Sequence, residues 1–178
     1  MAQRATVYRA DLAVSDLDRG VYSQHALTLA RHPSETEERL MVRLLAFALH
    51  ADEALAFGRG LSTEDEADLW QHDATGAIER WIDVGLPAEK DVRKACGRAR
   101  EVVVLAYGAR RVEQWWSDNA AALSRLANLK VLTLTAAETG ALQALAARSM
   151  TLTCTVQDGH VWLAAERATV EIAPARRV

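Results

Sequence analysis

The chain has 178 residues, of which half are hydrophobic and a quarter are charged, and its formal net charge is −3 at pH 7. This length and composition predict one soluble globular domain over residues 1–178. No apolar run approaches the ~20 residues needed to span a bilayer, and the N-terminus has no apolar signal segment, so we expect a cytoplasmic protein without a membrane partner. The net charge argues against coating nucleic acid by bulk electrostatics, although local basic patches can still hold phosphate.

The first part of the chain predicts a β-hairpin and then a helix. Residues 5–14 and 20–30 contain enough β-branched and aromatic residues for two strands joined by a polar turn. Ser34 and Glu37 have the spacing of a capping box, and an apolar stripe follows, so we expect a helix over residues 35–50. A short strand is expected next, over residues 54–57.

The middle of the chain predicts two antiparallel strands and a second helix. Strands are expected over residues 67–72 and 77–84, because a short polar segment with a glycine separates them. Pro87 suits the first turn of a helix over residues 87–98, near whose end lies Gly97. The packing face of this helix is expected to contain Val92, Ala95, Cys96 and Ala99.

The last part predicts alternating elements and a second hairpin. The apolar run 102–107 is typical of a strand buried on both faces. Asp158-Gly159 is a short hairpin signal. We therefore expect a single α+β domain with a mixed sheet, flanking helices and β-hairpins at both ends. The remaining expected elements are helices over 111–127 and 136–147, a strand over 130–135, hairpin strands over 151–156 and 160–165, and an edge strand over 169–172.

Two aspartates in the middle strands are the strongest candidate functional residues. Side chains alternate along a strand, so Trp81 and Asp83 share one face, and Asp68 and Trp70 share a face of the strand before it. With the turn centred between residues 74 and 75, Asp68 lies opposite Trp81 and diagonal to Asp83, within reach of one cation. A register shifted by one residue would separate the two carboxylates.

Paired carboxylates suit Mg²⁺ or Mn²⁺, which prefer oxygen ligands and keep waters that can be exchanged for phosphate. The alternative is that Asp68 and Asp83 are ordinary strand-end aspartates facing solvent. The five histidines show no metal-binding spacing, which argues against zinc. Cys96 and Cys154 are far apart in sequence and are expected to be free thiols.

Several uncommon strings are similar to those of one bacterial family, in that family's order. They include HPSETEERLMVRLLAFALHA, GLSTEDEADLWQ, WIDVG, RKACGRA, VVVLAYG and CTVQDGHVWL. Over almost its whole length the chain resembles the YaeQ family, whose fold is similar to that of PD-(D/E)xK nucleases. The resemblance implies a restriction-endonuclease-like core in the order helix, three strands, helix, strand, to which the elements over residues 35–107 correspond.

The resemblance places the nuclease motif on particular residues. The PD aspartate falls on Asp68, preceded by Ala67 where the motif has proline, and the second acidic residue falls on Asp83. The position of the motif lysine, two residues further on, is Gly85. In some nucleases of this fold the lysine has moved to the following helix, which makes Lys94 the candidate catalytic lysine here.

Further residues complete the predicted site. Lys90, Lys94 and Arg98 follow each other at four-residue spacing, as a basic stripe suited to nucleic acid or as an ordinary solvated helix face. The resemblance implies Glu38 as an additional metal ligand; the alternative role is to favour the helix N-terminus. Glu79 shares a strand face with Asp83 and is the other candidate ligand.

Two functions remain open from the sequence. The first is a nuclease or phosphodiesterase dependent on Mg²⁺ or Mn²⁺, with Asp68 and Asp83 as ligands and Lys94 as the displaced lysine. The second is a non-catalytic module of the same fold that binds nucleic acid or a protein partner. Some members of the YaeQ family have been associated with transcription elongation, but no residue considered above independently supports that role.

Overall fold

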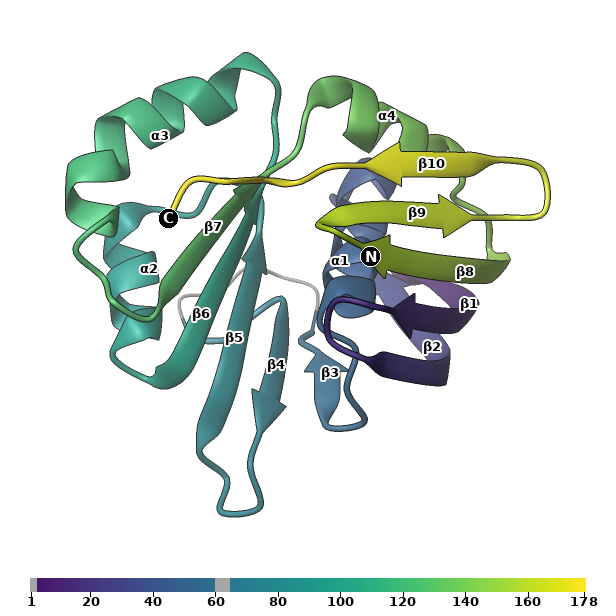
Figure 1. The fold of residues 1–178 in the computed structure, drawn as a ribbon, viewed down its shortest axis with the longest axis horizontal. Coiled ribbons are helices and arrows are strands. Elements are labelled where there is room, and N and C mark those ends of the chain that lie inside the picture. The colour runs from purple at the N-terminus through teal and green to yellow at the C-terminus, as the bar shows by residue number, and fades with distance from the viewer. Residues whose placement is uncertain (1–2, 60–64) are drawn as a thin grey trace. The chain divides into compact units, whose positions relative to one another are not determined.

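The computed structural model describes residues 3–59 and 65–178, which fold into two compact units (Figure 1). The first unit comprises Met1–Ala51 and Ala137–Pro174, and the second comprises Asp52–Ala136 and Ala175–Val178. The expected mixture of α and β structure is confirmed. No helix in the described part of the chain is long and apolar enough to cross a membrane.

The first unit is built on a five-stranded mixed sheet, in the order β10-β9-β8-β1-β2. The N-terminal hairpin forms as expected, with every residue of β1 paired antiparallel to β2. The C-terminal hairpin also forms, with Asp158 and Gly159 both at positive φ as its tight turn. The strands are β1 (Thr6–Asp16), β2 (Val21–Arg31), β8 (Ser149–Gln157), β9 (His160–Ala164) and β10 (Thr169–Ile172).

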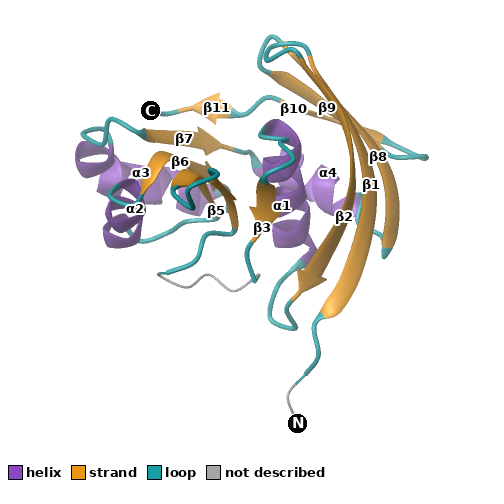
Figure 2. Ribbon diagram, turned by 90° about the horizontal axis from the view of Figure 1, so that it is seen from below, coloured by secondary structure: helices purple, strands orange, loops and turns teal. Residues whose placement is uncertain are grey.

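The two hairpins belong to one sheet, because β1 and β8 pair in parallel from Arg9–Ser149 to Asp16–Val156. Helices α1 (Glu37–Leu49) and α4 (Ala136–Ala144) lie on the same side of this sheet (Figure 2). The inward faces of β1 and β2 pack toward α1, where His25 makes an edge contact with Phe47.

The N-terminus of α1 differs from the expected capping box. The N-cap is Thr36, whose hydroxyl accepts a hydrogen bond from the backbone N–H of Arg39 at 3.1 Å. Ser34 instead lies 2.7 Å from the Nδ1 atom of His32. The prediction of Ser34 as the cap was wrong because Thr36 lies three residues before Arg39, the spacing at which a side-chain oxygen reaches a free helical N–H group.

The second unit is a six-stranded sheet, in the order β11-β7-β6-β5-β4-β3. β3, β4 and β5 pair antiparallel, whereas β5, β6 and β7 are parallel and joined through helices α2 and α3. Its elements are β3 (Leu55–Phe57), β4 (Leu69–His72), β5 (Ile78–Val84), α2 (Glu89–Cys96), β6 (Ala99–Ala106), α3 (Arg110–Leu123), β7 (Leu129–Thr133) and β11 (Ala175–Arg176).

Helices α2 and α3 cover the sheet face that carries Trp81. Val92 and Ala95 of α2 are buried there, as the sequence predicted, and Val112 and Trp115 of α3 join them. Their neighbours in the sheet are Val102, Val104, Ala106, Leu129 and Val131. The face that holds Asp83 is therefore the one against which α2 packs.

Candidate functional site

The structure brings Asp68 and Asp83 into contact in the second unit. Asp68 lies directly before β4 with only 2% of its surface exposed, and Asp83 is half-buried in β5. The backbone N–H of Asp68 lies 3.4 Å from Oδ1 of Asp83, and Oδ2 of Asp68 accepts the backbone N–H of Val84 at 2.8 Å. The two carboxylates therefore share one corner of the sheet.

The register between β4 and β5 differs from the predicted one by two residues. Trp70, and not Asp68, lies opposite Trp81, and Leu69 lies opposite Ile82. One residue of the difference comes from a bulge, because Gln71 pairs with Arg80 but His72 pairs with Ile78, and the other comes from the turn, where the N–H of Asp73 bonds the carbonyl of Ala77. Because side chains alternate with a period of two, this shift keeps the predicted residues on one face.

Trp81 links Asp83 to the basic side of α2. Its indole Nε1 donates a hydrogen bond to Oδ2 of Asp83 at 2.9 Å. The guanidinium of Arg98 lies over the Trp81 ring, 5.2 Å from its centroid, a distance suited to a cation–π contact. Trp70 packs edge to face on Trp81, with ring centroids 5.9 Å apart, and so helps to hold the Trp81 ring beside Asp83.

Lys90 and Lys94 are exposed on α2, and Arg98 is exposed in the turn after it, because the helix ends at Cys96 and not at the expected residue 98. Lys94 and Arg98 both contact Asp65. Nζ of Lys94 lies 2.9 Å from Oδ1 of Asp65, and Nη1 of Arg98 lies 3.7 Å from the same atom. Lys90 is exposed one turn before Lys94. The hydrogen bond from Lys94 lowers the pKa of the Asp65 carboxyl below its ordinary value.

Sequence reasoning gave Asp65 no role. The one sequence feature that could have drawn attention to it is the acidic segment 64–66, to which it belongs. Glu64 of this segment lies outside the described residues. A loop has no fixed periodicity, so nothing in the sequence indicated that Asp65 would meet a helix 29 residues further along the chain.

Gly85 has a conformation that explains the missing motif lysine. Its φ is +102°, a value that residues with a Cβ rarely adopt, and its N–H bonds the carbonyl of Leu105 at 3.0 Å. A lysine here would be strained whatever space surrounded it.

The two additional glutamates are placed differently. Glu79 is the extra residue of the β5 bulge, and its carboxylate lies 3.0 Å from Nη1 of Arg100. Glu38 lies in the first turn of α1 and belongs to the first unit, whereas Asp68 and Asp83 belong to the second. The role of either glutamate as a metal ligand stays a prediction.

The chemistry of this corner fits only a particular kind of metal site. Within residues 3–59 and 65–178, no three His, Cys, Asp or Glu side chains gather in a metal-binding cluster. Mg²⁺, however, is commonly held by one or two carboxylates and completes its shell with water and substrate phosphate. Asp68 and Asp83 fit a Mg²⁺ ion that is held by two carboxylates and otherwise by water and phosphate.

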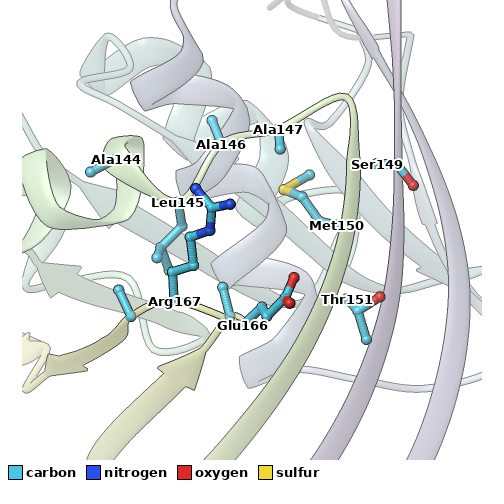
Figure 3. Close-up of a pocket in the computed structure, with 11 residues that line it drawn as sticks. Ala144, Leu145, Ala146, Ala147, Ser149, Met150, Thr151, Glu166 and Arg167 are labelled. Atoms are coloured by element: carbon cyan, nitrogen blue, oxygen red, sulfur yellow. The ribbon is translucent and has the colours of Figure 1, made fainter.

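A separate hollow of about 450 Å³ lies in the first unit, around the end of α4 and the turn between β9 and β10. Its charged lining residues are Glu166 and Arg167. Figure 3 shows Arg167 extending toward Ala146, whereas the Glu166 carboxylate lies on the side of Thr151. None of its lining residues was predicted to be functional.

Comparisons with known proteins agree in sequence and in structure. The model of the family described as YaeQ protein matches residues 1–174. The YaeQ protein of Salmonella typhi is 46% identical over 172 residues, which cover 97% of this chain and 95% of that protein. That of Escherichia coli K12 is 44% identical over the same shares of both chains.

Two crystal structures of YaeQ proteins have the same fold. The protein from Xanthomonas axonopodis pv. citri superposes with a TM-score of 0.94 at 54% identity, over 97% of this chain and 98% of that one. The protein from Pseudomonas syringae superposes with a TM-score of 0.92 at 36% identity, over 98% and 96% of the two chains. The chain belongs to the YaeQ family.

Proposed function

We propose that this YaeQ-family protein is a phosphodiesterase of nuclease type that depends on Mg²⁺ or Mn²⁺ and acts at Asp68 and Asp83. The observation that carries the proposal is the contact between these two aspartates, one of them almost fully buried, on the sheet face covered by α2. The Asp68 carboxylate already accepts the N–H of Val84, but two neighbouring carboxylates repel each other when both are ionised, and a bound cation offsets that repulsion, so the pair favours a cation site.

A divalent ion bound here would lower the pKa of a bound water and neutralise charge on a phosphoryl group. Asp68 and Asp83 would hold the ion. Trp81 orients Asp83 through its indole N–H, and Arg98 lies on the outer side of that ring. These contacts restrict the motion of the Asp83 carboxylate before any substrate arrives.

Lys94 supplies the mobile positive charge of the proposed mechanism. Its ammonium group is bound to an exposed carboxylate, that of Asp65, and an exposed ion pair contributes little to stability. A phosphate group can therefore replace Asp65 as the partner of Lys94 at small cost. In this role Lys94 neutralises charge on the substrate, while Glu79 is the candidate additional ligand from the same unit.

The test is cleavage of a broad set of single- and double-stranded DNA and RNA with Mg²⁺ and with Mn²⁺. We expect Asp83→Asn and Asp68→Asn to abolish cleavage and to weaken Mn²⁺ binding measured by titration. Asp118→Asn removes the same charge from the exposed face of α3 and should change neither. Intact substrates with both metals, or equal cleavage by all variants, would refute the proposal.

A second candidate function is a non-catalytic module that binds nucleic acid. It is favoured by the exposure of Lys90, Lys94 and Arg98 and by the carboxylate of Asp65 that Lys94 and Arg98 share. Asp65→Asn should then strengthen salt-sensitive retention of nucleic acid without turnover, because it removes the competing anion. Absence of retention at low salt would instead point to a protein partner.

A further inference from the structure

Strand β2 is the one long sheet edge in the described part of the chain. It has eleven residues and pairs only with β1, whereas the strands at the other edges, β10, β3 and β11, have four, three and two residues. Natural proteins usually protect long edges with charges, proline or bulges, because an unpaired edge is a template for another strand.

The backbone groups at the free edge of β2 can be identified. The N–H of Arg9 bonds the carbonyl of Arg148 and the N–H of Leu17 bonds that of Val156, so the odd-numbered residues of β1 face β8. The even-numbered residues of β1 therefore face β2, where they meet its odd-numbered residues. The even-numbered residues of β2 point their N–H and C=O groups outward, and they are Tyr22, Gln24, Ala26, Thr28 and Ala30.

None of these outward residues protects the edge. All of them are exposed and none is charged. In the described part of the chain, one outward backbone group of this edge has a hydrogen-bond partner: the carbonyl of Ala30 accepts a hydrogen bond from Nη2 of Arg43. The described large hydrophobic side chains that remain exposed also gather on this hairpin: Val7 at 43%, Leu17 at 46% and Tyr22 at 69%.

We propose that β2 pairs antiparallel with β2 of a second copy of this chain, about a two-fold axis at Ala26. Two such strands exchange hydrogen bonds only where an outward residue of one copy lies opposite an outward residue of the other. Among the registers that meet this condition, the one centred on Ala26 pairs the whole strand Val21–Arg31 with the same strand of the second copy. It places Gln24 opposite Thr28 of the second copy, and no two charges of the same sign face each other.

The same register matches the exposed hydrophobic residues. Tyr22 of one copy comes to lie opposite Ala30 of the other, and Ala30 is itself paired with Val7 on the outer face of the sheet. Alanine is small enough for the tyrosine ring to lean across it toward Val7, and the two-fold axis repeats this contact at the other end. Both side chains lose exposed apolar surface, which supplies the hydrophobic contribution to pairing.

The strand contact alone is smaller than the roughly 1,000 Å² typical of a stable interface, so we expect a weak, reversible dimer that a covalent bond can trap. In Ala26→Cys the two new cysteines face each other across the axis, with Cα atoms about 5.5 Å apart, a distance that allows a disulfide. In Thr28→Cys, the matched control, they lie about 13 Å apart along the strand, too far for one.

The experiment oxidises both variants and the unmodified chain, whose own Cys96 and Cys154 supply the background. We expect a covalent dimer from Ala26→Cys at least ten times more abundant than from Thr28→Cys. Sedimentation over a dilution series should show reversible dimers of the unmodified chain, which Ala26→Lys abolishes by placing two ammonium groups face to face. A monomer at every concentration, or equal cross-linking by the two cysteine variants, would overturn the proposal, as would a dimer that survives Ala26→Lys.

Discussion

Glu101 joins three neighbouring strands of the second unit and should make the stability of the protein depend on pH. Its carboxylate is 2.6 Å from Nε of Arg80 on β5 and also accepts a hydrogen bond from Lys130 on β7. Burial raises the pKa of this carboxyl, but the hydrogen bonds from Lys130 and Arg80 outweigh it and lower the pKa from 4.5 to about 2.

The contribution of Glu101 to the free energy of unfolding follows from this lowered pKa. A carboxyl whose pKa falls from 4.5 in the unfolded chain to about 2 in the folded one would stabilise the fold by about 3 kcal/mol at neutral pH. The Glu101 side chain keeps 24% of its exposure and its partners are more exposed, so solvent screening reduces our expectation to about 1–2 kcal/mol. Because the folded-state pKa is the lower one, this stabilisation is complete above about pH 4.5 and is lost as pH falls toward 2.

The assay is urea unfolding of the unmodified chain and of Glu101→Gln at about pH 7 and about pH 3. We expect the variant to lose about 1–2 kcal/mol at neutral pH and most of this difference to disappear at the acidic pH. Glu53→Gln, which removes the same charge from an exposed loop, is the control and should have no such pH-dependent effect. A difference that stays constant with pH would refute the electrostatic explanation.

Four further substitutions test three local features by the free energy of unfolding. Glu35→Gln should cost about 3 kcal/mol, because it leaves the guanidinium of Arg43, which is 1% exposed, without its charged partner; retention of full stability would contradict this. Thr36→Ala should cost about 1 kcal/mol through loss of the α1 cap, whereas Ser34→Ala should cost less. Ala109→Gly should stabilise by about 1 kcal/mol, because φ is +54° at this N-cap of α3; a loss of stability would show that the alanine is not strained.

Much of the fold follows from local patterns. The turn at Asp158-Gly159, the apolar run of β6 and the stripe of α2 each specify an element through its own residues. The parallel pairing of β1 with β8 was not predicted, because alternation shows which residues share a face but not which strand lies alongside. The two hairpins were therefore expected as separate additions, although they form one sheet.

In the candidate site, too, local patterns were predicted correctly and tertiary contacts were not. Strand alternation was enough to place Asp68 and Asp83 together, and it remained correct despite the two-residue change of register because the shift was even. The bulge at Glu79, which accounts for one residue of this change, has no signature in the sequence. The partner of Lys94 also escaped prediction, because Asp65 lies in a loop and a loop side chain is positioned by tertiary contacts.

At residue 85, where the family resemblance led us to expect a lysine, the backbone disfavours any residue with a Cβ. The chain turns sharply after β5, and Gly85 takes a positive φ there while its N–H bonds the end of β6. The same turn presents the N–H of Val84 to the carboxylate of Asp68, so the geometry that disfavours a lysine at residue 85 also helps to hold the first aspartate. A positive charge at this corner is therefore more easily supplied by Lys94 of α2 and by Arg98 in the turn after it, which contact Asp65 and Trp81, than by the strand that carries Asp83.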